Sequence, residues 1–364
     1  RCYLKRIVLL LLVSLGIGNA LYANNELKIL ADSLHKMIDA KPLFVQKKEQ
    51  RIARIKCLLK DSGLTPDREY KINLQLYNEY KKFNIDSAIH YVDRNLEIAR
   101  QLNRNYLKYQ SSLQLSLVYS MCGRYRDAEL LLENIKPSEL PRSLLATYYD
   151  TYARFWEYYS ISATNNQYGK KREAYQDSLY ALMDHTSFDY KLSRAYSYAG
   201  RDSTKAIKIL DELLTAEEVG TPNYAMITHS YAMLSRYLKR EDDAKKYLMM
   251  SAIADIQNAT RETASLQALA LIQYEENNLA DAFKFTQSAI DDVVSSGIHF
   301  RAMEIYKFYS IINTAYQTEE ARSKSNLITF LISTSVSLFL LVVLVVSIYI
   351  QMKKTLRMKR ALAQ

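Results

Sequence analysis

The 364-residue sequence has few of the residues that build tight turns. It contains only eight glycines and five prolines, against roughly 12% of residues for these two types together in an average protein. Chains made of many β-hairpins need such residues at their turns, so this scarcity favours long helices with short connections. Cysteine usage is also sparse, at three residues.

Patterns that carry catalysis or bind metals are missing too. The five histidines are widely scattered, and neither HExxH nor CxxC occurs. Beyond residue 23 no two glycines are close neighbours, so there is no loop to cradle a phosphate, and the GxSxG nucleophile turn is absent. The sequence therefore predicts no metal, no cofactor and no catalytic activity.

The formal net charge of +10 suggests at first a protein that binds nucleic acid. Most of this charge lies at the two ends. Arg1, Lys5 and Arg6 contribute three positive charges, and the acid-free segment 351–364 contributes five, which leaves +2 for the residues between. We therefore expect this segment to bind no nucleic acid.

An uncharged run of 24 residues, 327–350, is the longest apolar stretch. A helix needs about 20 such residues to cross the hydrocarbon core of a bilayer. Only basic charges follow the run, and basic flanks stay on the cytoplasmic side. We predict a single transmembrane helix over 327–350 in the inner membrane, with residues 24–326 in the periplasm and a cytoplasmic helix beginning at 351–364.

Residues 1–23 have the order of a secretory signal peptide: basic residues, an apolar run over 7–17, and small residues up to Ala23. An uncleaved membrane anchor is the alternative. Export places Cys57 and Cys122 in an oxidising compartment. Because both lie in helical patterns, two buried free thiols are favoured over a disulfide.

A helical lead-in is predicted over residues 24–64. Apolar residues recur at spacings of three and four over 26–37 and again over about 44–59. The sequence Ala40-Lys41-Pro42 separates these two helices. Thr65 and Pro66 are then expected as the N-cap and first residue of the next helix.

An internal repeat fills residues 65–322. Its clearest copy contains Leu115, Tyr119, Gly123 and Ala128 at the spacing of a tetratricopeptide repeat. The alanine of such a helical hairpin lies where the two helices cross most closely, since a larger side chain would push the backbones apart. The equivalent alanines are Ala88, Ala128, Ala206, Ala244 and Ala282.

Successive repeat alanines are separated by 40, 78, 38 and 38 residues. The double interval predicts a degenerate hairpin with helices over about 143–160 and 172–183. Six hairpins should stack into a curved solenoid with a concave face, and a last helix over about 301–318 would close the stack and lead into the membrane. The predicted fold class is therefore all-α: a tetratricopeptide-like α-α superhelical solenoid followed by a single transmembrane helix.

The densest cluster of aromatic residues lies in the degenerate hairpin. Tyr149, Tyr152, Trp156 and Tyr159 form a stripe at helical spacing. The simpler interpretation is that the stripe packs against neighbouring hairpins. The sharper hypothesis is that these four rings line a groove and stack on an oligosaccharide or a peptide, which makes them the candidate ligand-binding residues.

Thr329, Ser333 and Ser337 share one face of the predicted membrane helix. Small residues at this spacing let two membrane helices approach closely, which predicts a homodimer. Alternatively, each hydroxyl bonds a carbonyl of its own helix. A helical pattern also continues past the membrane run without a stop signal, so we expect a cytoplasmic module to follow.

Local stretches add to this order of parts: Lys48-Glu49-Gln50-Arg51-Ile52 in the lead-in, and Tyr77-Asn78-Glu79-Tyr80 followed by Asp86-Ser87-Ala88 and Tyr91 in the first repeat. With them the chain resembles the membrane-spanning tetratricopeptide regulators of Bacteroides-type bacteria, of which the SusR-like starch-utilisation regulators are familiar members. The resemblance implies a periplasmic sensor that signals through one helix to a cytoplasmic helix-turn-helix part. That part would control polysaccharide-utilisation genes.

The sequence thus predicts the membrane-anchored sensor segment of a transcription regulator, without the output part itself. Two alternatives stay open. The repeat domain could be a membrane-tethered scaffold that gathers periplasmic proteins, or it could be the input half of a sensor histidine kinase.

Overall fold

The computed structural model describes residues 25–163, 166–262 and 264–362, so the predicted signal peptide lies outside the described residues. Within these ranges every regular element is a helix. The chain divides into two compact units, with the boundary between Tyr309 and Ser310.

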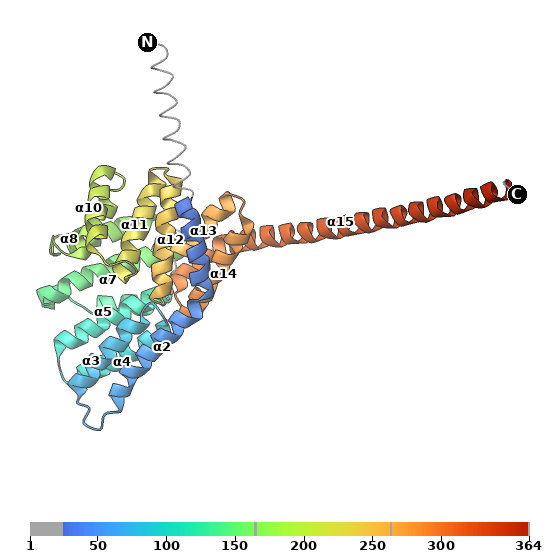
Figure 1. The fold of residues 1–364 in the computed structure, drawn as a ribbon. Coiled ribbons are helices and arrows are strands. Elements are labelled where there is room, and N and C mark those ends of the chain that lie inside the picture. The colour runs from blue at the N-terminus through green and yellow to red at the C-terminus, as the bar shows by residue number, and fades with distance from the viewer. Residues whose placement is uncertain (1–24, 164–165, 263, 363–364) are drawn as a thin grey trace, which may run out of the picture. The chain divides into compact units, whose positions relative to one another are not determined.

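Six helical hairpins follow one another along the described part of the first unit (Figure 1). They are α3 (Pro66–Tyr80) with α4 (Ile85–Gln101), α5 (Asn105–Met121) with α6 (Tyr125–Glu133), α7 (Arg142–Ala163) with α8 (Gly169–Tyr180), α9 (Phe188–Tyr198) with α10 (Ser203–Ala216), α11 (Pro222–Tyr237) with α12 (Glu241–Gln257), and α13 (Ala264–Glu275) with α14 (Leu279–Ser296). Two helices precede the hairpins, one over 25–39 and α2 (Lys41–Cys57), and α15 (His299–Leu362) follows them. The remaining elements are short 3-10 turns: η1 (Leu58–Lys60), η2 (Pro137–Glu139) and η3 (Asn166–Tyr168). This confirms the predicted fold class, and α7 with α8 is the degenerate hairpin.

The repeat alanines lie where the helices of each hairpin cross. All five are completely buried, with 0% of their surface exposed: Ala88, Ala128, Ala206, Ala244 and Ala282. Across one such contact the Ser116 hydroxyl donates to the Ala128 carbonyl at 3.1 Å, a distance that a larger side chain would prevent. Helix α8 has no equivalent alanine and buries Leu179 instead.

Short turns begin and end these helices as the sequence indicates. The Thr65 side chain accepts a hydrogen bond from the Arg68 backbone N–H, which confirms it as the N-cap of α3. Gly123 between α5 and α6 has a φ of +82°, and a Cβ on it would lie 2.8 Å from Cδ2 of His299. This turn therefore needs glycine both for its left-handed backbone and for space.

The lead-in connects the last hairpin to the first. In the helix over 25–39, His35 Nε2 lies 3.0 Å from Asp281 Oδ1 of α14, and Figure 1 shows this helix beside α14. Farther along, Lys48 of α2 forms an ion pair with Glu79 of α3 at 2.9 Å. The lead-in thus spans the gap between the two ends of the repeat array.

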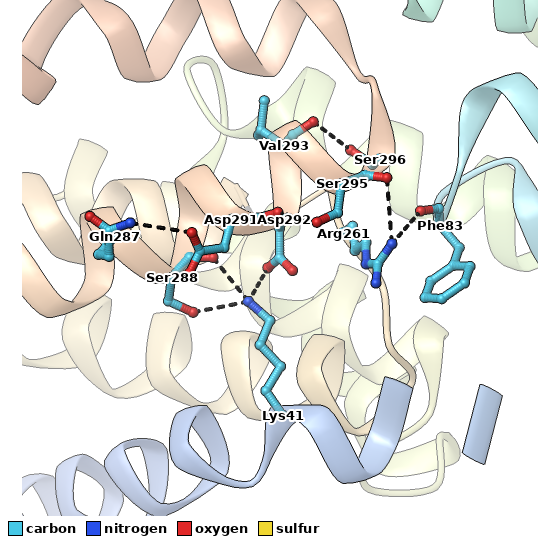
Figure 2. Close-up of polar contacts among 10 residues, drawn as sticks. All are labelled: Lys41, Phe83, Arg261, Gln287, Ser288, Asp291, Asp292, Val293, Ser295 and Ser296. Atoms are coloured by element: carbon cyan, nitrogen blue, oxygen red, sulfur yellow. Dashed lines mark hydrogen bonds and ion pairs between the residues drawn. The ribbon is translucent and has the colours of Figure 1, made fainter. Parts of the chain in front are cut away.

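Figure 2 shows the contacts that complete this closure. The Lys41 ammonium group donates to the backbone oxygen and the hydroxyl of Ser288, each at 2.9 Å, and to Asp292 Oδ2 at 2.5 Å. Beside it, the Arg261 guanidinium donates to the Phe83 carbonyl at 3.1 Å and lies 3.9 Å from the centre of the Phe83 ring. The first and last hairpins therefore meet. The expected concave face therefore lies inside an array whose two ends are in contact.

One hydrophobic core joins the beginning and end of the repeat array. It contains Ile72 and Leu76 of α3, Val118 of α5, Tyr158 of α7 and Phe300 of α15. Tyr158 and Phe300 stack with their ring centres 4.1 Å apart. Because residues from both ends bury the same surface, closure is part of the hydrophobic core and does not depend on polar contacts alone.

The second unit consists of the remainder of α15. Among the described residues this is the one helix long and apolar enough to cross a membrane; its most apolar window has a mean hydropathy of 2.7 and is not buried by protein. Large apolar side chains along 327–350, such as Phe339 and Leu340, are more than half exposed. Apolar surface of this length is what a bilayer covers.

Cys57 and Cys122 are both unpaired. Cys122 is half-buried, but Cys57 is exposed. The expectation of two buried thiols is therefore wrong for Cys57, which is the last residue of α2.

Candidate functional site

The inner face of the solenoid contains a partly open cavity of about 730 Å³. Its walls come from α7, α8 and α9 on one side, from α11, α12 and α13 on the other, from the turn between α3 and α4, and from the first turns of α15. Cavities of this size hold small organic ligands. Because Lys82 of the first hairpin and Phe300 of α15 line it together, this complete lining requires the two ends of the repeat array to lie close to each other.

Charged side chains of both signs line the cavity. The cations are Lys82, Arg154, Arg172 and Arg301, and the acids are Asp150, Glu157, Asp189, Asp255, Glu262 and Glu304. Charged groups are rarely placed in protein interiors unless they are paired or functional. The partners of each group therefore decide what the cavity can bind.

Glu262, in the segment between α12 and α13, is the centre of the main ion-pair cluster. It lies 2.7 Å from Lys82 and 3.5 Å from Arg301, and Arg301 also pairs with Glu304 at 2.7 Å. Burial acts to raise the pKa of Glu262, but the charges of Lys82 and Arg301 outweigh it and hold the pKa well below its usual range. Glu262 therefore stays ionised and connects the first hairpin to α15.

Asp255 on α12 differs from the other cavity acids near it. Its side chain makes no ion pair or hydrogen bond with any described residue, although its carboxyl lies near Lys82 and Glu262. Burial raises its pKa to about 7, against the opposing charge of Lys82. Close to neutral pH this carboxyl is thus divided between its protonated and ionised forms.

A chain of hydrogen bonds fixes His229 in the cavity wall. The Ser251 hydroxyl donates to the Ala225 carbonyl at 2.8 Å, and the Ser265 hydroxyl donates to Ser251 at 2.8 Å. Ser265 must therefore accept from His229 Nδ1, which lies 3.1 Å away, so His229 Nε2 carries a free lone pair. Burial lowers the pKa of His229 to about 4, which keeps the ring neutral.

None of the four residues of the predicted ligand groove lines this cavity: Tyr149, Tyr152, Trp156 and Tyr159. Tyr152 stacks on Tyr175 of α8 with ring centres 4.5 Å apart, and Trp156 stacks on Tyr168 at 5.6 Å. Tyr149, Tyr152 and Trp156 also pack against the core formed with α5 and α6. These contacts match the simpler interpretation, in which the stripe packs between hairpins.

The opposite face of α7 contributes the cavity residues that the sequence did not reveal. Asp150, Arg154 and Glu157 recur at spacings of four and three, which places them on one side of the helix. Such a row looks like an ordinary solvated face. The row lies opposite the aromatic stripe, so α7 has a functional or packed surface on both sides. This was the one signal from which the sequence could have indicated the cavity residues of α7.

The three small residues of the predicted membrane-helix contact bond to their own helix. Thr329 Oγ1 donates to the Ser325 carbonyl at 2.9 Å, Ser333 Oγ to the Phe330 carbonyl at 2.9 Å, and Ser337 Oγ to the Ser333 carbonyl at 2.8 Å. Such bonds do not prevent a second helix from approaching this face. The homodimer stays a prediction.

A family model described as the SusR N-terminal TPR domain, where TPR denotes the tetratricopeptide repeat, matches residues 38–307. This range covers α2, all six hairpins and every residue that lines the cavity. The chain belongs to this family. The SusR TPR match ends before the apolar segment 327–350. No curated protein matches the chain.

Proposed function

We propose that the chain is the sensor segment of a signalling protein, in which a small ligand binds in the cavity and α15 carries the resulting change across the membrane. Membership of the SusR TPR family supports the sensor part. The observation that carries the proposal is the course of α15. Its residues Phe300, Arg301 and Glu304 line the cavity, and the same helix continues through the apolar residues 327–350.

In this proposal residues 24–326 lie in the periplasm, 327–350 cross the inner membrane, and the basic residues after them lie in the cytoplasm. The output would regulate transcription of polysaccharide-utilisation genes, and a homodimer through Thr329, Ser333 and Ser337 would bring two outputs together. The segment itself has no catalytic role and binds no nucleic acid. Alkaline phosphatase fused after residue 326 should be active, whereas a fusion after residue 362 should be inactive.

Arg301 is the residue through which a ligand would act on α15. It forms ion pairs with Glu262 and Glu304, and its Nε is buried without a partner among the described residues. A ligand that displaces either acid changes the charges around the first turns of α15. A change in this helix can then pass along its axis, because an α-helix is a stiff element.

The test uses the full-length gene in the bacterium that carries it, with transcript levels of the controlled genes as the readout. Arg301→Leu should fix the response in one state, on or off, while the protein still reaches the membrane in normal amounts. Arg126→Leu is the matched control, because Arg126 is exposed on α6 and pairs only with Glu129 of the same helix. Normal induction in the Arg301 variant would exclude transmission through this residue.

The scaffold alternative needs an open concave surface on which other proteins can dock. The contacts of Lys41 with α14 and of Arg261 with Phe83 bring the two ends of the array together, which favours a small ligand in the cavity over a docked protein. A histidine-kinase output would use the same sensor. It would be distinguished by ligand-dependent autophosphorylation of the full-length protein.

A further inference from the structure

We infer that the ligand of the cavity carries an ammonium group and that the carboxylate of Asp255 binds it. The inference rests on the proposed sensor function and names the chemical class of its ligand. Three properties of the cavity support this ligand: the balance of its charges, the hydrogen-bonding groups that lack a donor, and the volume available.

The charges of the cavity wall are unbalanced. Each cation already has its own acid, in the pairs Lys82 with Glu262 at 2.7 Å, Arg154 with Asp150 at 2.9 Å, Arg172 with Glu157 at 3.8 Å, and Arg301 with Glu304 at 2.7 Å. Two acids, Asp189 and Asp255, remain without a cation among the described residues. The wall is therefore short of positive charge, which an ammonium group on the ligand would supply.

Of these two acids, Asp255 is the one placed to bind a ligand. Asp189 is exposed at the start of α9, where water stabilises its charge. Asp255 is half-buried in the cavity wall, and burial raises its pKa to about 7 against the opposing charge of Lys82, so its charged form is incompletely stabilised. An ammonium group within hydrogen-bonding distance would provide that stabilisation, because charge-assisted hydrogen bonds are about twice as strong as neutral ones.

One uncharged polar group of the same wall, the ring of His229, also lacks a hydrogen-bond donor. His229 Nε2 is an acceptor, because Nδ1–H donates to Ser265 and burial keeps the ring neutral. Asp255 and His229 therefore both present lone pairs that no described residue uses. A ligand ammonium group has three N–H donors and can serve more than one acceptor at a time.

The cavity volume of about 730 Å³ accommodates a molecule larger than a simple amine. A short peptide with a free amino terminus and an amino-sugar disaccharide both carry an ammonium group on a body of suitable size. The walls provide apolar contact for either, for example through the exposed side chains of Tyr196 and Met226. The ammonium group is the shared chemistry, and the experiment separates its two sources.

Binding is measured by isothermal titration calorimetry on the full chain in detergent micelles, with two matched pairs of probes. The first pair is leucyl-leucinamide and its N-acetyl form; the second is the disaccharide of glucosamine and the disaccharide of N-acetylglucosamine. Acetylation removes the positive charge and leaves the rest of the molecule in place. We expect at least one free amine to bind, and to bind at least about tenfold more tightly than its acetylated partner.

Two variants locate the bound ammonium group. Asp255→Asn removes the carboxylate but keeps the shape, and it should weaken binding of the free amine by about tenfold or more. It should fold, since it removes an unpaired acid from the interior. Asp189→Asn is the matched control: it removes the other unpaired acid of the wall and should change affinity by less than about twofold.

The pH dependence gives an independent readout. The ammonium group binds ionised Asp255, so a proton must leave this carboxyl wherever the pH lies below its pKa of about 7. The terminal amine of leucyl-leucinamide also loses its proton near pH 8, which opposes the titration of Asp255. Affinity should therefore fall about fourfold from pH 8 to pH 6 in the wild type and should not fall in Asp255→Asn. The charged groups acting on Asp255 are Lys82, Glu262, Asp292 and Arg301. Of these, Asp292 also titrates near this range, with a pKa of about 6.

Three outcomes would overturn the inference. They are equal or tighter binding of the acetylated probes, no binding by either free amine, and a pH dependence that persists unchanged in Asp255→Asn, which would assign it to Asp292. Tight binding of a neutral oligosaccharide such as maltotriose, with neither amine bound, would refute the ammonium ligand and leave the sensor function intact. Failure of the sensor function would appear separately, as a wild-type protein that binds the amine while transcript levels of the controlled genes do not change.

Discussion

Lys41→Met should destabilise the closed solenoid in a pH-dependent way. Lys41 reaches from α2 to α14, where it bonds Ser288 and Asp292 (Figure 2). Asp292 is 4% exposed, so the variant leaves a buried carboxylate without its cation. Breaking a buried pair from one side costs about 3–5 kcal/mol when the remaining group stays charged.

Protonation of Asp292 limits this loss. Burial raises the pKa of Asp292 from 3.8 to about 6 even with Lys41 present, a shift that corresponds to about 3 kcal/mol against the carboxylate. Without Lys41 the pKa rises further, and the carboxyl takes up a proton instead of remaining charged. We therefore expect the free energy of unfolding at pH 8 to fall by about 2–3 kcal/mol, which lowers Tm by about 4–10 °C.

The pH dependence has a definite sign. Because the pKa of Asp292 is higher in the folded than in the unfolded chain, its contribution to stability falls as pH rises from about 4 to about 6 and is level above that. In Lys41→Met the decline continues beyond pH 6. The difference in Tm between wild type and variant should therefore be small at pH 5 and large at pH 8. Asp255 is present in both proteins, so its titration cancels in the difference.

The assay is thermal unfolding of the full chain in micelles, followed by far-UV circular dichroism at both pH values. Asp292→Asn keeps an acceptor for Lys41 and should cost less than about 1 kcal/mol at pH 8. The double variant Lys41→Met/Asp292→Asn has no unpaired charge and should be more stable than Lys41→Met alone. An equal loss of Tm at pH 5 and pH 8 would refute the reasoning, as would a double variant no better than the single one.

Three further predictions concern the repeat backbone and are checked by the same thermal unfolding. Gly123→Ala should lower the free energy of unfolding by about 2 kcal/mol or more, because the φ of Gly123 is +82° and the new Cβ meets His299. The control Gly169→Ala, where a Cβ has nothing within 4 Å, should change it by less than about 1 kcal/mol. Lys239→Gly should stabilise by up to about 1 kcal/mol, since the lysine has a φ of 57°; an unchanged or lower Tm would contradict this. Ala244→Leu should cost about 1–3 kcal/mol by overfilling a fully buried helix crossing, and a neutral result would show that the crossing can widen.

The six hairpins were predictable because their signal is repeated. Ala88, Ala128 and Ala282 each lie at a close helix crossing, and the same steric requirement recurs about every 39 residues. The long apolar run at 327–350 is equally plain from sequence, because bilayer thickness fixes its length. Local caps such as Thr65 follow from their immediate neighbours.

Closure of the solenoid and its cavity could not be predicted in the same way. Lys41 and Asp292 are 251 residues apart, and one lysine and one aspartate carry no periodicity. The cavity charges on α7, such as Asp150 and Arg154, have the spacing of a solvated helix face. The aromatic stripe around Trp156 is more conspicuous, but its rings pack against each other and the core. Apolar side chains in the sequence indicate which residues are buried. They do not indicate which polar helix face lines a cavity.

The closure contacts and the cavity share the same short segments. Arg261 holds the first hairpin through its bonds to the backbone oxygens of Lys82 and Phe83, and the next residue, Glu262, pairs with the Lys82 side chain inside the cavity. A ligand that weakens the ion pair of Glu262 with Lys82 therefore acts directly on the two turns that close the solenoid. Coupling between distant sites is not required. Coupling of this kind is reciprocal. If ligand binding favours closure by a given factor, then weakening closure with Lys41→Met must reduce ligand affinity, although Lys41 does not line the cavity.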